Sequence, residues 1–136
     1  MAAMQLAAAG KMVLAVTTAG TVREAVRLLV AGLPPHRQPL ACHLLSGCLV
    51  GAVCQHLLPR ADGPGRVAGF ELLAVGPSAR EALSAGDWRE LSRLVDDGIE
   101  PGTIGIRQAL AEMAATGLIS HSTYRAKVTA LELAAG

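Results

Sequence analysis

Residues 53–73 read VCQHLLPRADGPGRVAGFELL, and this stretch decides the fold. Two apolar runs of strand length flank a centre rich in glycine and proline, and helical patterns lie on both sides of the stretch. Asp62-Gly63 is a strong hairpin signal, because glycine accepts the positive φ that tight turns require. We therefore predict a β-hairpin over residues 53–73, with its turn at Asp62-Gly63.

Length and composition limit the classes of partner. The chain has 136 residues, which suits one domain. Its core must be aliphatic, because Phe70, Trp88 and Tyr124 are the only aromatic residues. A formal net charge of +1 gives no electrostatic footprint for nucleic acid, and so few aromatic rings leave no platform for base stacking. We expect no nucleic-acid partner.

The cysteines and histidines show no metal-binding spacing. Cys42, Cys48 and Cys54 are odd in number and contain no C-x-x-C pair, so we expect small buried side chains in a reducing cytoplasm. The four histidines are not spaced as ligands with one another. His43 falls in a helical pattern and His56 in a strand, so we interpret them as hydrogen-bonded structural residues and predict no metal site.

One segment has the length of a membrane span. Residues 40–58 are long enough to cross a bilayer, but His43, Gln55 and His56 would be expensive in lipid. A buried helix that leads into a buried strand explains the same residues, and we favour a cytoplasmic protein. A small membrane protein built on residues 40–58 is a further alternative.

The segment before the hairpin has the pattern of half an α/β unit. The continuous apolar run at residues 12–16 predicts a strand that is covered on both faces in a parallel sheet. Thr21 and Glu24 have the spacing of a capping box and predict the start of a helix. Further helices are expected from Pro39 towards Gly51, from Gly76-Pro77 through Leu83, from Asp87 to Gly98, from Ile106 to Gly117, and from Ser120 through about Leu133.

No catalytic constellation is evident from the residues. Gly10-Lys11 is the only Gly-Lys pair, but Gln5 stands where a phosphate-binding P-loop needs its first glycine, and the pair precedes a strand. The serines include no G-x-S-x-G elbow. Asp96-Asp97 and Glu100 form a small acidic cluster, which we interpret as a solvated helix end. We predict no catalytic residue.

The hairpin stretch closely resembles a segment of the PilT-like retraction ATPases, which drive twitching motility of type IV pili and belong to the type II/type IV secretion ATPase family. The similarity is carried by residues 55–60 and 62–73. Residues 10–15 are similar to the family's Gly-His-Leu-Val strand, and residues 33–38 to its Phe-Pro-Pro-x-x-Gln turn. Downstream, Gln108-Ala109-Leu110 and Gly117-Leu118-Ile119-Ser120 match two further motifs in order. The resemblance covers about residues 4–126.

The resemblance implies an α/β fold that is the C-terminal part of a RecA-like P-loop ATPase domain. Residues 1–76 would supply part of the ATPase core, with a parallel strand, helices and the hairpin. Residues 77–136 would form a C-terminal helical region. Intact members bind ATP and Mg²⁺, form hexameric rings in the cytoplasm at the inner membrane, and act with the pilus platform protein of that membrane.

Departures from the family pattern limit what this chain can do. The P-loop and the Walker B segment are absent from the sequence, so we predict neither ATP hydrolysis nor a bound cofactor for the chain alone. Thr18 stands where the family has the histidine of its Leu-His-Thr box, which is tied to nucleotide sensing. Residues 76–83 occupy the place of the family's retraction segment, where Arg80 matches in type and Leu83 is a conservative replacement. Arg80 and Leu83 are therefore candidate motor residues, although Arg80 also fits an ordinary exposed charge near a helix start.

Two functions follow from the resemblance. The chain is the C-terminal portion of a PilT-like retraction ATPase and is inactive alone, or it is a non-catalytic interaction or regulatory module that docks on a full-length secretion or pilus ATPase. The second function predicts a folded chain that co-purifies with a full-length homologue.

Overall fold

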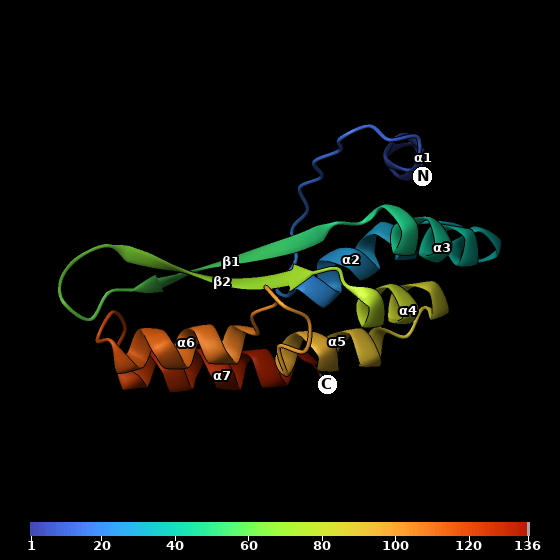
Figure 1. Cartoon of the computed structure of the whole chain (residues 1–136). Coiled ribbons are helices and arrows are strands. Elements are labelled where there is room, and N and C mark those ends of the chain that lie inside the picture. Colours follow the sequence, from blue (N-terminus) through green and yellow to red (C-terminus); the bar gives the residue numbers. More distant parts are fainter. Residues whose placement is uncertain (136) are drawn as a thin grey trace.

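The computed structural model describes residues 1–135, in which helices lie along one side and at the open end of a long β-hairpin (Figure 1). Every helix expected from the sequence is present. In chain order the elements are α1 (Ala2–Ala8), α2 (Val22–Ala31), the 3₁₀ turn η1 (Pro35–Arg37), α3 (Gln38–Cys48), β1 (Gly51–Pro59), β2 (Arg66–Ala74), α4 (Pro77–Ala85), α5 (Trp88–Asp96), α6 (Ile106–Ala115) and α7 (His121–Ala135).

The predicted hairpin is confirmed by the pairing of β1 with β2. β1 and β2 pair antiparallel, and partners are equidistant from the Asp62–Gly63 bond, so that Gly51 faces Ala74 and Pro59 faces Arg66. The connection is a loop over residues 60–65 and not a tight turn. Pro64 has no N–H to donate, so the ladder cannot continue to the centre.

The predicted strand at residues 12–16 is wrong for this structure. Residues 11–19, all of them described, form neither helix nor strand, and Met12 and Val16 are 89% and 99% exposed. The hairpin is the only sheet in residues 1–135, so no parallel strand is formed there. An apolar run becomes a strand only where neighbouring strands accept its backbone hydrogen bonds, and no such neighbour lies beside these residues.

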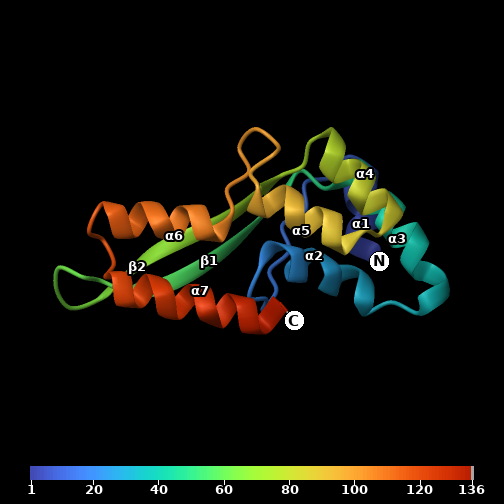
Figure 2. The same ribbon diagram turned by 90° about the horizontal axis from the view of Figure 1, so that it is seen from below.

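The hairpin passes through two hydrophobic clusters. The first lies at its open end, where α2, α4 and α5 contribute Val26, Leu83 and Leu94. The second lies towards the loop, where Leu58 of β1 meets Leu110 of α6 and partly buried residues of α7. Figure 2 shows α6 and α7 running along the loop half of the hairpin. The core is aliphatic, as predicted.

Two predicted helix starts are confirmed in atomic detail. Thr21 Oγ1 accepts the Glu24 N–H at 3.2 Å, and Glu24 Oε2 accepts the Gly20 N–H at 2.7 Å, which completes the capping arrangement of α2. The Asp87 carboxylate accepts the Glu90 N–H at 2.9 Å and caps α5 in the same way. These local bonds fix where the two helices begin.

The segment with the length of a membrane span is divided between two elements. Its first part belongs to α3, which ends at Cys48, and its second part lies in β1, which begins at Gly51. Within residues 1–135 no helix has both the length and the apolar character needed to cross a bilayer.

Candidate functional site

The two candidate motor residues on α4 have different surroundings. Arg80 is exposed, and its Nη1 donates to the Ser46 carbonyl oxygen at 2.6 Å. Ser46 lies in the last turn of α3, where carbonyl oxygens lack an intrahelical partner and favour a cation. Leu83 is fully buried in the first hydrophobic cluster. The structure therefore does not bring Arg80 and Leu83 together on one surface.

The start of α4 is held by a residue from a distant loop. Glu100 is only 7% exposed, and its Oε1 accepts the N–H groups of Ser78 at 2.7 Å and Ala79 at 3.3 Å. Our interpretation of Glu100 as part of a solvated helix end is therefore wrong, although Asp96 and Asp97 are exposed. A helix N-terminus attracts a carboxylate through its free N–H groups and its dipole, so Glu100 positions the segment that carries Arg80.

Thr18 lies in the segment that precedes α2. Its side chain is exposed, within the stretch at residues 11–19 that forms no regular structure. The next residue, Ala19, accepts a hydrogen bond from the Cys54 thiol, with 3.5 Å between sulfur and oxygen. The segment is thus anchored to β1 directly after Thr18.

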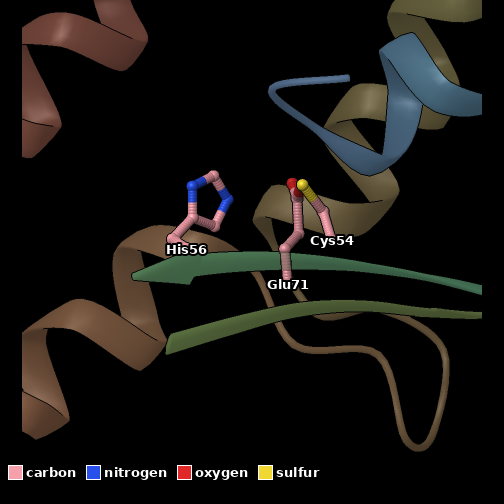
Figure 3. A group of neighbouring side chains, drawn as sticks. All are labelled: Cys54, His56 and Glu71. Carbon is pink, nitrogen blue, oxygen red and sulfur yellow. The ribbon is translucent and has the colours of Figure 1, made fainter. Parts of the chain in front are cut away.

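A cluster of three polar side chains lies on the inner face of the hairpin, at Cys54, His56 and Glu71 (Figure 3). Cys54 and His56 are two residues apart on β1 and therefore share a face, and Glu71 of β2 lies directly opposite Cys54. One ligand atom from each residue lies within 4.8 Å of the other two. The cluster combines a sulfur, a nitrogen and an oxygen donor.

Only two members of this cluster have hydrogen-bond partners that account for their burial. Glu71 Oε2 accepts the Val22 N–H at 2.7 Å, and Cys54 donates to Ala19. His56 is 6% exposed, and its buried Nε2 has no hydrogen-bond partner in the part of the chain that the structure describes. The prediction that His56 is a hydrogen-bonded structural residue is therefore not met at this nitrogen.

Burial shifts the pKa of all three groups. Burial lowers the pKa of His56, and the positive charge of Lys127 adds to the effect; both favour the neutral imidazole. Burial raises the pKa of the Cys54 thiol, and the nearby Glu71 carboxylate raises it further. Burial also raises the pKa of Glu71, although the hydrogen bond from Val22 acts in the opposite direction.

The sequence signal for this cluster is the pairing of residues across the two strands, and not their spacing along one segment of the chain. Cys54-x-His56 places two ligand types on one face of a strand, and pairing about the Asp62–Gly63 centre places Glu71 opposite Cys54. The prediction of no metal site rested on the spacing of cysteines and histidines along the chain. Such spacing does not detect ligands that meet from two paired strands, so the cluster was not predicted.

Comparisons with known proteins show that the chain is similar to part of a pilus ATPase and to part of a twitching motility protein. No model of a known protein family matches it. It is 30% identical over 119 residues to the type IV pilus ATPase PilU of Pseudomonas aeruginosa, a match that covers 88% of this chain and 31% of PilU. It is 27% identical over 108 residues to a twitching motility protein of Neisseria gonorrhoeae, covering 79% of this chain and 29% of that protein. The chain thus spans about three tenths of the length of the curated relatives it matches.

Solved structures show the same partial likeness. The pilus retraction motor PilT with bound ADP superposes with a TM-score of 0.71 at 23% identity, over 82% of this chain and 30% of PilT. The ATPase DotB of Legionella pneumophila superposes with a TM-score of 0.67 at 22% identity, over 83% of this chain and 30% of DotB. The fold is that of a C-terminal part of an ATPase domain, as the sequence predicted. Over about three tenths of their length, the chain is thus similar to the PilT-like ATPases of type IV pili.

Proposed function

We propose that the chain is the C-terminal portion of a PilT-like retraction ATPase and works together with a P-loop-containing part of such a subunit. The observation that carries the proposal is the extent of the match, which takes in 88% of this chain but only 31% of PilU. In this proposal residues 1–76 complete a RecA-like core, and residues 77–136 form the helical region that follows it. ATP and Mg²⁺ are bound by parts outside this sequence, in a hexameric ring at the inner membrane that engages the pilus platform protein.

An uncovered apolar surface supports an assembled state. Val53, Leu57 and Phe70 lie on the outer face of the hairpin, and each is at least 44% exposed. The apolar segment at residues 12–16 is exposed as well. Adjacent apolar residues left open in this way mark surfaces that other parts of a protein cover. A complete ATPase core would supply sheet neighbours for residues 12–16.

Within this proposal the family-matched positions have separate roles. Arg80 is the exposed motor residue of α4, and it donates to the Ser46 carbonyl oxygen at the carboxyl end of α3. Leu83 packs in the first hydrophobic cluster and holds the same helix in place. Thr18 lies where the family senses nucleotide, and a threonine hydroxyl cannot carry the charge that a histidine can. We therefore expect this chain to sense nucleotide weakly at this position when it is assembled.

A chimera tests the proposal. In PilU of Pseudomonas aeruginosa, the matched segment is replaced by the corresponding residues of this chain, and phosphate release from ATP is measured. We expect the chimera to hydrolyse ATP, since its P-loop comes from PilU, and we expect the 136-residue chain alone to give no turnover above buffer. Turnover by the chain alone, or a folded chimera that binds ATP without hydrolysing it, would contradict the proposal.

The same exposed surface favours one alternative, a non-catalytic module that docks on a complete ATPase ring. This alternative predicts that the chain co-purifies with full-length PilU and changes its ATP turnover. Phe70→Ser is expected to weaken that co-purification, while Arg89→Ser, an exposed change on α5, serves as its control. If the chain neither binds full-length PilU nor alters its turnover, the docking module is ruled out.

A further inference from the structure

We propose that Cys54, His56 and Glu71 form a binding site for one divalent transition-metal ion, with zinc as the best match. The site would lie on the inner face of the hairpin, on the opposite side from Val53, Leu57 and Phe70. This inference is independent of the proposed motor function, because it rests on the hairpin's own side chains.

The donor set and its geometry suit zinc. Thiolate sulfur, imidazole nitrogen and carboxylate oxygen are the protein ligands that zinc prefers, whereas magnesium and calcium prefer oxygen alone. Ideal tetrahedral bonds to zinc separate such donors by roughly 3.4–3.6 Å. The three ligand atoms already lie within 4.8 Å of one another. Side-chain rotations that move these atoms by about 1 Å would bring them to bonding positions around one ion.

His56 supplies the second observation. Its Nε2 is buried without a hydrogen-bond partner in the described residues, and one ring nitrogen faces Cys54 and Glu71 in Figure 3. A buried acceptor or donor left without a partner destabilises the folded chain. A metal ion at the centre of the cluster would bind this nitrogen, for which residues 1–135 provide no hydrogen-bond partner.

The two other ligands can bind a metal with little rearrangement. Glu71 keeps its hydrogen bond to the Val22 N–H through one carboxylate oxygen and can offer its other oxygen to the ion. Cys54 would lose its thiol proton to solvent and its long contact with Ala19, and the resulting thiolate would bind the metal. A pocket of about 70 Å³ borders Glu71, and in this proposal a water from that side supplies the fourth ligand.

The nearby charges both oppose and favour the binding of a metal ion. Lys127 is close enough to shift the titration of Cys54 and His56, and its positive charge opposes an incoming cation. The same charge favours the thiolate and the neutral imidazole, which are the forms that bind metal. Glu71 and the neighbouring Asp96 contribute negative charge on this side, where Arg23 and Arg107 line the same pocket.

Cobalt(II) binding to the complete, reduced chain tests the site. We expect one equivalent of cobalt to bind and to give a thiolate-to-cobalt charge-transfer band that zinc abolishes by displacement. Cys54→Ser should remove the band, and His56→Gln and Glu71→Gln should each weaken binding by about tenfold or more. Cys48→Ser is the matched control, because this half-buried thiol lies outside the cluster and should bind cobalt as the unchanged chain does.

The variants also separate metal binding from folding. Glu71→Gln retains an oxygen that can accept from Val22, and circular dichroism of each metal-free variant verifies its fold. If Cys54→Ser does not fold, then His56→Gln and Glu71→Gln decide the matter by the same titration. A folded chain that takes up no cobalt or zinc, a band that persists in Cys54→Ser, or equal losses in Cys48→Ser and in the cluster variants would overturn the proposal.

Discussion

Replacing Glu100 should loosen the helix that carries Arg80. In the structure its buried Oε1 accepts the Ser78 and Ala79 N–H groups at 2.7 and 3.3 Å, across more than twenty residues of sequence. A side-chain cap is worth about 1 kcal/mol, and a partly buried charge at a helix end up to about 2 kcal/mol. Because these contributions overlap, we expect Glu100→Ala to lower the free energy of unfolding by about 2–3 kcal/mol.

A second substitution separates the two contributions. Glu100→Gln keeps an oxygen acceptor and removes the charge, so we expect a loss of about 1 kcal/mol. Urea unfolding followed by circular dichroism measures both losses. At this chain length about 3–5 °C of melting temperature corresponds to each kcal/mol, so Glu100→Ala should melt about 6–15 °C lower.

The control is Glu81→Ala, an exposed carboxylate on the same helix, for which we expect a change within about 0.5 kcal/mol. If Glu100→Ala unfolds at the same urea concentration as the unchanged chain, Glu100 does not cap α4. Equal losses in Glu100→Ala and Glu100→Gln would show that the charge carries the whole effect and would refute our division of it.

Three further substitutions test the same region by urea unfolding. Gly76→Ala should cost about 1–3 kcal/mol, because a Cβ there overlaps the Glu100 carboxylate, and a stabilised variant would contradict this packing. Leu83→Ala should cost about 2–5 kcal/mol, while Leu40→Ala, 53% exposed on α3, should cost far less; equal costs would refute the core position of Leu83. Arg80→Ala should cost less than about 1 kcal/mol, because an exposed hydrogen bond to a carbonyl contributes little net stability, and a larger loss would assign Arg80 a structural role.

Helix starts and the hairpin could be predicted because their causes are local in the sequence. The hydroxyl of Thr21 lies three residues before the N–H that it accepts, and the Asp87 carboxylate acts over the same distance. The hairpin pairs residues symmetrically about Asp62–Gly63, so its centre also sets its register. Each of these features involves residues whose separation in the sequence determines their separation in space.

Features that depend on distant residues could not be predicted in this way. Residues 12–16 have the composition of a buried strand, but burial requires a neighbour, and an apolar run does not reveal whether that neighbour is present. Glu100 carries a carboxylate, as do the exposed Asp96 and Asp97 before it, and only the return of the chain beside α4 turns Glu100 into a cap. Sequence patterns report the preference of a segment, whereas these outcomes depend on what the segment meets.

Most of the inner face of the hairpin is apolar, as is usual for an antiparallel sheet, but its middle departs from that order. Midway along it, the inner face carries His56 and Glu71, while the outer face carries Leu57 and Phe70. A hairpin that had to be stable on its own would gain from the opposite arrangement, since burying polar groups and exposing apolar ones both cost free energy. The two proposals would each supply a partner at this point of the hairpin, a metal ion inside and the remainder of an ATPase core outside. Because the two faces share no side chain, metal titration and the PilU chimera test these partners separately.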